Sequence, residues 1–485
     1  MCSLVMINSV EGPALEEAKL EVKTKSPPEK RDSNQKYVFA HHMVGNTAPY
    51  TVEDWKQDIQ LANASGIDAF ALNIGSDSWQ SDQVKNAYTA AQQLGSNFKM
   101  FLSLDMSILP CVSPENATAL RKTATAYADH PAQFKYNNKA FVSTFSGEQC
   151  TFGQGNAAQG WSSQFKSQLS NIFFVPNLNI DPTTLGSYSN AIDGEFNWNS
   201  AWPIAANNVT FKAAVQKAGA AQDNVVNTQY SQLITQISDV NHGYSSSLDT
   251  DQQYIGALKD KLYLAGASPW FFTHYSPSSY NKNWVYLSDL LYPTRWQAII
   301  SARNKFPMVE IITWNDYGES SYIGPIKGAQ PNSQAWVNGF DHSAFLDMTK
   351  YFITAYKTGK YPTVQEDKIY LWARPHKKDA TSSDPVGKPR DFDIMEDALF
   401  AVVLAKEQSS VTLSTKSITK TVQVKAGLSE LSLPLKPGDT MSASLSRNNQ
   451  VVAQVKPSNF TFQDNANIYN FNAFTAMSGG TATTA

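Results

Sequence analysis

Short apolar runs alternate with helical patterns from residue 37 to about residue 315, and this alternation restricts the possible folds more than any other feature of the chain. The runs are rich in Val, Ile, Phe and Ala, and they lack the apolar–polar alternation of a strand with one face in water. They are therefore expected to be strands that are buried on both faces. The runs are Lys36–Val44, Asp68–Ile74, Lys99–Leu104, Ala140–Phe145, Phe173–Leu178, Ala191–Phe196, Tyr263–Trp270 and Val309–Trp314.

Helix signals lie between these runs. The stretch TVEDWKQDIQLANASG begins at Thr51, has Glu53 as a cap carboxylate and ends at Gly66. Two further helical stretches end at Gly95 and Pro131. Strands and helices in this alternation predict a (β/α)8 TIM-like barrel. A doubly wound sheet is the alternative, but no G-x-G-x-x-G or P-loop motif follows the first strand.

The pattern changes after about Tyr370. Short β-type runs such as ALFAVVLAKE and SVTLSTKSI are separated by polar turns, which is typical of an all-β sandwich. We therefore expect four parts: a charged, disordered extension over residues 1–36, a catalytic barrel over 37–365, a β-sandwich over 366–474 and a disordered tail over 475–485. Packing of the sandwich against the barrel is expected rather than polymer binding, because its strands carry few aromatic residues of the exposed type.

Composition excludes some partners. Lys and Arg number 39 against 42 Asp and Glu, a net charge of −3, so the chain has no basic excess for nucleic acid. Charged residues make up 17% of the chain and aromatic residues 12%, a balance that suits an uncharged polar ligand such as a sugar. The chain contains no run of about 18 apolar residues, so the sequence predicts no membrane helix. The N-terminus lacks the basic region of a secretory signal, so the compartment stays open.

Polar and aromatic residues follow most of the predicted strands, at the edge where parallel barrels hold their active sites. The candidates for substrate binding are His42, Asp105, Asp193, Glu195, Trp198, Tyr275 and Trp314. Carboxylates, amides and aromatic rings together favour glycoside hydrolysis, in which one carboxyl group protonates the leaving oxygen and another activates water or attacks. For Asp105 alone, an N-cap or turn role is about as good an explanation.

Asp316 and Glu319 are the candidate catalytic residues. They stand three positions apart after a buried run and beside Trp314. Metal binding is the competing interpretation, but His41 and His42 are adjacent and would point to opposite faces of a strand. A serine hydrolase is disfavoured because no G-x-S-x-G motif is present. We expect a monomer that needs neither a metal nor a cofactor.

The chain has three cysteines, and Cys111 and Cys150 each follow a predicted strand. Spacing alone favours a disulfide and a pair of buried thiols about equally. A disulfide between them would stabilise the fold by about 4 kcal/mol on the chain-entropy model.

Four segments together resemble glycoside hydrolase family 71, the fungal α-1,3-glucanases or mutanases. They are YVFAHHMVGNTAPYTVEDWKQDIQLANASGIDAFALNIG, FSGEQCTFG, DGEFNWNSAWP and TWNDYGESSYIGPI. The similarity runs from about Tyr37 to the C-terminus, and LWARPHKKDAT resembles the β-domain of that family. The resemblance implies an endo-acting, inverting hydrolase of α-1,3-glucan, a fungal cell-wall polymer. It also implies that Asp316 is the base, that Glu319 is the acid and that Cys111 pairs with Cys150.

Two other functions remain open on the sequence. One is a non-catalytic α-glucan-binding protein on the same scaffold, which would be favoured if the carboxylate pair were broken. The other is a hydrolase of a different linkage, such as an α-mannoside, a choice that the rim residues would decide.

Overall fold

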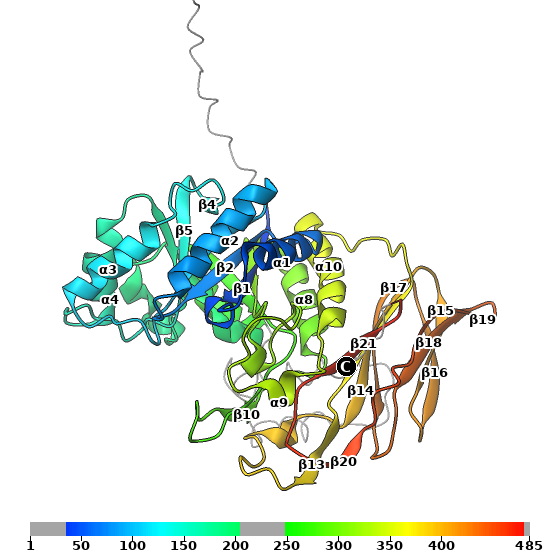
Figure 1. The fold of residues 1–485 in the computed structure, drawn as a ribbon. Coiled ribbons are helices and arrows are strands. Elements are labelled where there is room, and N and C mark those ends of the chain that lie inside the picture. Colours follow the sequence, from blue (N-terminus) through cyan, green and yellow to red (C-terminus); the bar gives the residue numbers. More distant parts are fainter. Residues whose placement is uncertain (1–34, 204–247, 480–485) are drawn as a thin grey trace, which may run out of the picture. The chain divides into compact units, whose positions relative to one another are not determined.

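The computed structural model describes residues 35–203 and 248–479 (Figure 1). Almost all of the extension predicted for residues 1–36 lies outside this part, as do residues 480–485 of the predicted tail. The first residues of that tail differ from the prediction, because Phe474–Met477 forms strand β21 and pairs with β12. The described part is a mixed α/β structure.

A curled, nine-stranded sheet forms the centre of the N-terminal part, and only β4 is antiparallel to its neighbour. Its strands are β1 (Tyr37–Met43), β2 (Ala69–Ile74), β3 (Lys99–Asp105), β4 (Lys135–Tyr136), β5 (Lys139–Phe145), β6 (Ile172–Val175), β7 (Gly194–Asn197), β8 (Leu262–Ala267) and β11 (Met308–Ile311). Each of the eight expected runs coincides with one parallel strand, although the ends shift by up to three residues.

The order of the parallel strands follows the chain, and β1 lies between β2 and β11. This order curls the sheet until its two end strands, β6 and β7, come together. They share no ladder, but the Asp193 N–H donates to the Phe174 carbonyl at 2.8 Å, and the Phe196 N–H donates to the Pro176 carbonyl at 2.7 Å. The carboxyl ends of all eight parallel strands therefore lie at one edge.

Helices connect the strands and cover the sheet (Figure 1). The longer ones are α1 (Val52–Ala64), α2 (Gln80–Leu94), α3 (Pro114–Thr125), α7 (Leu248–Leu258), α8 (Leu291–Ser301) and α10 (Ser343–Thr358). Short ones are α4 (Ala157–Gln159), which continues as a π-helical segment to Phe165, and α9 (Gln334–Val337). The predicted cap of α1 is present, but Asp54 rather than Glu53 closes it: the Asp54 carboxylate accepts the Thr51 N–H, and Thr51 Oγ1 accepts the Asp54 N–H.

From residue 368 onward the described elements are strands and one short 3-10 turn (Phe392–Ile394). The strands are β12 (Lys368–Ala373), β13 (His376–Ser382), β14 (Ala398–Ala405), β15 (Ser409–Ser414), β16 (Thr419–Val424), β17 (Gly427–Pro434), β18 (Ser442–Arg447), β19 (Gln450–Val455), β20 (Gln463–Ala466) and β21 (Phe474–Met477). They form two four-stranded antiparallel sheets, β17-β14-β12-β21 and β16-β15-β18-β19, and the pair β13-β20.

Strands β12 and β14 are buried on both faces. Along β12, Ile369 and Leu371 belong to a hydrophobic cluster shared by the two four-stranded sheets. Tyr370 and Trp372, on the other face, belong to the cluster that includes the core of the curled sheet. The alternation of side chains along a strand thus joins the two parts, which explains why the described residues from Lys36 onward form one compact unit.

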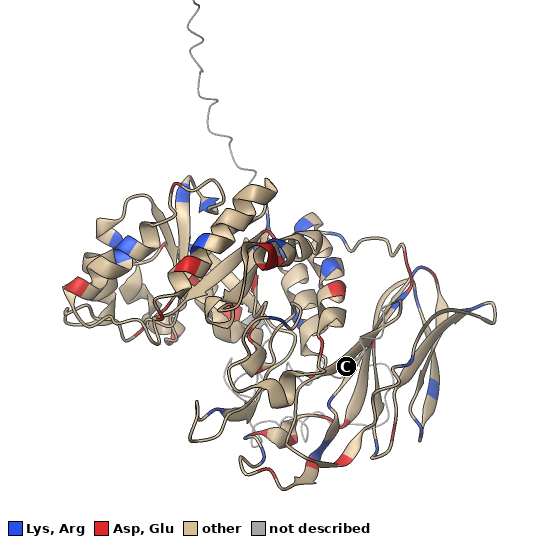
Figure 2. Cartoon of the chain, viewed as in Figure 1, with Lys and Arg blue, Asp and Glu red and all other residues tan. Residues whose placement is uncertain are grey.

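Charges are spread over the described part. Figure 2 shows Lys and Arg interspersed with Asp and Glu rather than gathered on one element. No described helix combines the length and the hydropathy needed to cross a membrane.

Candidate active site

The pair Asp316 and Glu319 lies just beyond the carboxyl end of β11, on the short helix η7 (Tyr317–Glu319). Asp316 caps this helix, and its Oδ1 accepts the Glu319 N–H at 3.3 Å. Both residues are partly exposed. Burial, followed by the charge of Glu319, raises the pKa of Asp316 to about 7.

Backbone contacts hold the segment that carries Asp316. The side chain of Asn315 accepts the Met43 N–H at 2.7 Å and donates to the Met43 carbonyl at 3.1 Å, which fastens the segment to the end of β1. Thr313 Oγ1 accepts the Asp316 N–H at 2.8 Å. Asn315 was not among the predicted residues, although its place inside the W-N-D-Y-G-E motif could have suggested a positioning role.

Lys282 is the cation of the site. Its Nζ lies 2.9 Å from Glu319 Oε1. The charge of Glu319 raises the pKa of Lys282 against the effect of burial, and Asp316 and Asp105 contribute further. Lys282 thus interacts with three carboxyl groups at once. The sequence offered no signal for it, because Lys282 lies on the hairpin between β9 (Phe272–His274) and β10 (Asn283–Val285) and belongs to no recognisable motif.

Asp105 joins this group from the last position of β3. Its Oδ1 accepts the N–H of Ser107 at 3.1 Å. Burial raises its pKa, whereas Ser107, His41 and Lys282 act in the opposite direction. Asp105 therefore has the turn role that the sequence left open, and it also lies among the carboxyl groups of the site.

A polar layer lies inside the curled sheet beneath these carboxylates. His41 Nδ1 lies 2.7 Å from Glu310 Oε1, and both residues are fully buried. The ring of Trp198 packs edge-on against His41 with 4.8 Å between centroids. Deeper in the sheet, the core is aromatic, and the ring centroids of Phe39 and Phe101 lie 5.0 Å apart. Trp198 is thus near the site, but its ring is 9% exposed and packs on its neighbours.

Tyr275 also lies beside the carboxylate pair. A Cβ added at Gly318 would stand 2.1 Å from the Tyr275 hydroxyl oxygen, so the glycine between Asp316 and Glu319 makes room for this side chain. The hydroxyl donates to the Pro331 carbonyl at 3.0 Å. Burial raises the pKa of Tyr275, and the charge of Asp316 raises it further.

His42 lies elsewhere than predicted. It points to the helix side of β1, where its Nε2 lies 3.3 Å from Asp58 Oδ2 under α1, and it is fully buried. Successive residues of a strand face opposite sides, so His41 occupies the interior position that we expected for its neighbour.

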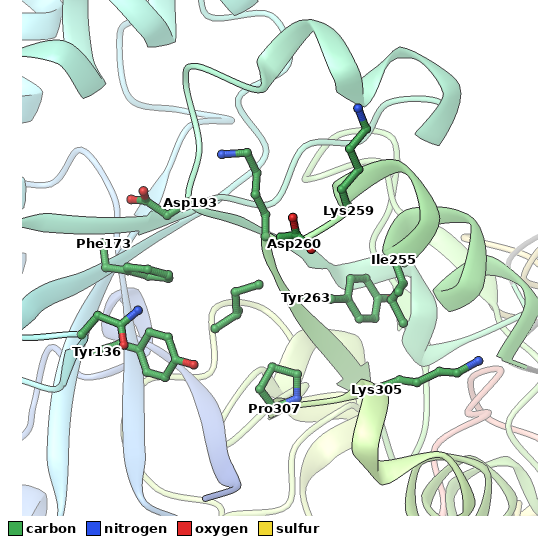
Figure 3. Close-up of a pocket in the computed structure, with 12 residues that line it drawn as sticks. Tyr136, Phe173, Asp193, Ile255, Lys259, Asp260, Tyr263, Lys305 and Pro307 are labelled. Atoms are coloured by element: carbon green, nitrogen blue, oxygen red, sulfur yellow. The ribbon is translucent and has the colours of Figure 1, made fainter. Parts of the chain in front are cut away.

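Asp193 is likewise displaced, because β7 begins only at Gly194. It therefore stands at the amino end of the sheet, where it pairs with Lys166 and accepts the Phe174 N–H at 2.8 Å. There it lines a pocket of about 390 Å³ together with Phe173 and Tyr136 (Figure 3). This pocket lies at the opposite edge from Asp316.

Glu195 and Trp314 face the helices rather than the site. Asn197 donates to the hydroxyl of Tyr263, which bonds Asp251 of α7, and Glu195 shares that face of β7. Glu195 is fully buried and accepts the Leu178 N–H at 2.6 Å, and burial holds its pKa well above the ordinary value. Trp314 is also fully buried, with its ring 5.0 Å from that of Phe70. The structure therefore brings Asp105, Tyr275, Asp316 and Glu319 together, places Trp198 nearby, and leaves the other four apart.

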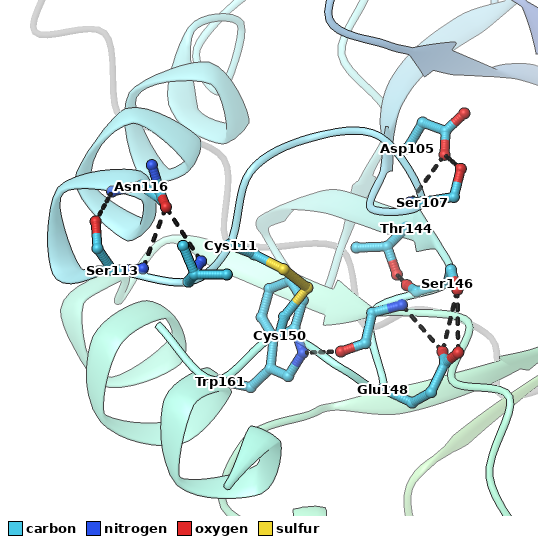
Figure 4. The surroundings of a disulfide bond; sticks show 12 residues. Asp105, Ser107, Cys111, Ser113, Asn116, Thr144, Ser146, Glu148, Cys150 and Trp161 are labelled. Carbon is cyan, nitrogen blue, oxygen red and sulfur yellow. Dashed lines mark hydrogen bonds between the residues drawn. A yellow bond between two sulfur atoms is a disulfide. The ribbon is translucent and has the colours of Figure 1, made fainter. Parts of the chain in front are cut away.

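A disulfide joins Cys111 and Cys150 (Figure 4). It links the loop after β3, which begins next to Asp105, to the loop after β5, which carries Glu148. The Trp161 ring nitrogen donates to the Gly147 carbonyl at 2.8 Å and fixes the second loop. The bond therefore restrains two neighbouring loops at the carboxyl edge.

A smaller pocket of about 200 Å³ also lies at the carboxyl edge, beyond β6 and β7. Its lining is rich in amides and aromatic rings and includes Asn179, Asn199, Trp202 and Tyr254. Trp202 packs against Tyr286, whose pKa is raised by burial and by the charge of Glu319. Tyr286 thus lies between this pocket and the carboxylate pair.

Comparison with known proteins identifies the family. The sequence model of glycosyl hydrolase family 71 matches residues 34–485. The chain belongs to this family. As a family 71 protein it is a glycoside hydrolase, and the resemblance inferred from its motifs is confirmed.

Two curated relatives cover nearly the whole family 71 chain. The glucan endo-1,3-alpha-glucosidase agn1 of Schizosaccharomyces pombe is 37% identical over 452 residues, which cover 91% of this chain and 94% of the relative. A mutanase of Penicillium rubens is 31% identical over 454 residues, 92% of this chain and 90% of the relative. Among solved structures, the GH99 endo-alpha-mannosidase of Bacteroides thetaiotaomicron matches with a TM-score of 0.44 and 12% identity, over 68% of this chain and 99% of that one.

Proposed function

We propose that this chain hydrolyses α-1,3-glucosidic bonds within the α-1,3-glucan of fungal cell walls, with Asp316 and Glu319 as an inverting acid/base pair. The observation that carries the proposal is the grouping of these two carboxyl groups with Asp105 and Lys282 at the carboxyl edge of a parallel sheet. The names of the curated relatives, a glucan endo-1,3-alpha-glucosidase and a mutanase, support the substrate.

The chemistry needs two carboxyl groups in opposite protonation states. One donates a proton to the leaving glycosidic oxygen, and the other removes a proton from the water that attacks the opposite face of the sugar. In an inverting pair the carboxyl groups stand roughly 6.5–9.5 Å apart, which leaves room for that water. The two groups have different surroundings: burial and the charge of Glu319 raise the pKa of Asp316 to about 7, whereas Glu319 forms an ion pair with Lys282.

The roles carried over from the family make Asp316 the base and Glu319 the acid. In the unliganded protein, however, burial and the charge of Glu319 raise the pKa of Asp316 to about 7 and so favour its neutral form. The proposed roles therefore require that Asp316 is charged when glucan is bound.

Replacing each carboxyl group by its amide tests whether Asp316 and Glu319 are the catalytic pair. Asp316→Asn and Glu319→Gln should each lower the hydrolysis of α-1,3-glucan by at least about a hundredfold, because the acid and the base each contribute roughly 10²–10⁴. The exposed carboxylates Asp379 and Glu366 provide the controls Asp379→Asn and Glu366→Gln, which should keep full activity. Near-wild-type activity in either site variant would contradict the assignment.

An aryl α-1,3-oligoglucoside needs little protonation of its leaving group. Glu319→Gln should therefore still cleave it, whereas Asp316→Asn should not, unless azide is added to replace the activated water. The reverse pattern would exchange the two roles, a result that the raised pKa of Asp316 favours.

We also propose that the curled sheet is a (β/α)8 barrel closed between β6 and β7, with residues 366–474 as a β-sandwich domain. The two backbone hydrogen bonds between β6 and β7 support closure. The hydrophobic cluster shared by the two four-stranded sheets supports the sandwich.

A further inference from the structure

Three aromatic rings form a row that runs from the core to the surface beside the carboxylate pair. Trp336 is 3% exposed and packs edge-on against Tyr275, with 4.9 Å between ring centroids. Tyr275, which is 8% exposed, packs edge-on against Tyr280 at 4.7 Å. Tyr280 is 56% exposed. The row thus ends in a ring that is supported from behind and open to solvent.

The hairpin between β9 and β10 fixes this outer ring next to the site. The Tyr275 N–H donates to the Lys282 carbonyl, and the N–H groups of Ser279 and Asn281 both donate to the Ser276 carbonyl at 3.0 Å. Tyr280 therefore lies within a hydrogen-bonded turn rather than on a loose tip.

Both ends of this turn contact the catalytic segment. On one side the Tyr275 hydroxyl occupies the space above Gly318, between Asp316 and Glu319. On the other side Lys282 pairs with Glu319. The position of Tyr280 is thus coupled to the two carboxyl groups through residues that touch them.

Single exposed tyrosines are common on protein surfaces, so exposure alone does not indicate a binding role. The position of Tyr280 on the molecule does. Within residues 35–203 and 248–479, Tyr280 and Tyr361 are the aromatic residues among the exposed large hydrophobic side chains. Tyr361 follows α10, whose Lys357 bonds Asp68 just before β2, so it lies at the amino edge of the sheet. Tyr280 alone of the two lies at the carboxyl edge.

A pyranose ring presents an apolar C–H face and a rim of hydroxyl groups, and the first of these matches the face of an aromatic ring. We propose that Tyr280 is a stacking platform for a glucosyl residue of the α-1,3-glucan chain, next to the bond that Asp316 and Glu319 cleave. This inference rests on the proposed function and adds a substrate-binding residue to it.

Steady-state kinetics on a soluble α-1,3-linked glucose oligosaccharide test the platform. Tyr280→Ala should lower kcat/KM by up to about tenfold, mainly through KM, because an aromatic contact contributes about 0.5–1.5 kcal/mol. Tyr280→Phe keeps the ring and should stay within about twofold of the wild type. Tyr361→Ala removes another exposed tyrosine, 44% exposed and at the other edge, and should leave both constants unchanged. Equal melting temperatures verify that the variants fold.

The outcomes separate the platform from the proposed function. If the wild type cleaves the oligosaccharide but Tyr280→Ala behaves like Tyr361→Ala, the platform is wrong and the proposed function stands. A tenfold loss in Tyr280→Phe as well would also contradict stacking, because it would assign the effect to the hydroxyl. If the wild type releases no sugar from α-1,3-glucan, the proposed function fails and the platform fails with it.

Discussion

At the scale of single residues, the site combines an acid whose neighbours favour its neutral form with a cation whose neighbours favour its charged form. Asp316 is partly buried near two other carboxyl groups, which raises its pKa, although Lys282 and the Glu319 N–H act in the opposite direction. Lys282 also pairs with Glu319, and its own pKa is raised by the three carboxyl groups. A protein tolerates such an arrangement at a catalytic site because the chemistry needs it, at the expense of stability.

Asp316→Asn should therefore stabilise the protein at neutral and higher pH. An acid whose pKa is raised in the folded state contributes full stability below its unfolded pKa of about 3.9, and it loses this contribution as the pH rises towards 7. The free energy of unfolding of the variant should exceed that of the wild type by roughly 1–3 kcal/mol at pH 8 and by little at pH 4. Thermal melting of both proteins at the two pH values measures this. A gain of the same size at pH 4 would show that the charge is not the cause.

Gly318→Ala should impair activity while the fold persists. The added methyl group would displace the Tyr275 hydroxyl, which stands 2.1 Å from the new Cβ, and with it the segment between the two carboxyl groups. A displacement of this size costs up to about a hundredfold in rate. The double variant Gly318→Ala/Tyr275→Phe removes the clashing oxygen and should recover part of the loss. Assays on α-1,3-glucan test this, and full activity in Gly318→Ala would contradict it.

Sequence placed residues together where the backbone position decides their location, and it misplaced those whose location depends on side-chain direction. Asp105, Asp316 and Glu319 come together because each follows a correctly predicted strand. His42 lies apart from them because the choice between two adjacent histidines depends on which face of β1 is interior. Asp193 lies apart because β7 begins three residues later than the predicted run. Lys282 could not be predicted, since only the folded hairpin brings it to Glu319.

At the scale of elements, the helices and strands form largely where local signals indicate. The Thr51 capping box begins α1, Ser113 caps α3 with Pro114 in the first turn, and Gly95 ends α2 with a φ of 61°. The π-helical segment after α4 has no such signal, because it arises from packing around Trp161 and Phe165. The loops at the carboxyl edge depend on long-range contacts, and the disulfide is the strongest of these.

Replacing both Cys111 and Cys150 by Ala should lower the free energy of unfolding by about 4 kcal/mol on the chain-entropy model. The lost restraint acts on the loop beside Asp105, so activity should fall before the protein unfolds globally. Denaturant titration of the variant and of the wild type, each with and without reductant, measures both effects. An unchanged unfolding midpoint in the variant would contradict a stabilising role for the bond.

At the scale of the whole molecule, the C-terminal strands complete the core of the curled sheet. Trp372 packs against Phe345 of α10 with 5.4 Å between ring centroids, and its ring nitrogen donates to the Asp289 carbonyl. Sequence indicated an all-β part here from its change of pattern. It could not show that β12 and β14 are buried on both faces, because an unbroken apolar run fits several arrangements.

Ending the chain after Thr363 should therefore give insoluble protein. The truncation removes Tyr370, Trp372 and Phe400 from the cluster that includes the core of the curled sheet, and it exposes apolar partners such as Phe345 of α10 to water. Expression and size-exclusion chromatography of the truncated chain test this against the full chain. A soluble, monomeric and active fragment would show that the C-terminal part is not needed for the core.

The most direct test of the proposed function is proton NMR of the first sugars released from α-1,3-glucan, with the wild type and Asp316→Asn measured side by side. We expect the wild type to release oligosaccharides whose new reducing ends are first β-anomers, because inversion converts the α-linkage, and we expect Asp316→Asn to release none. Release of α-anomers first would contradict inversion. Equal release by both proteins, or none from the wild type, would contradict the account as a whole.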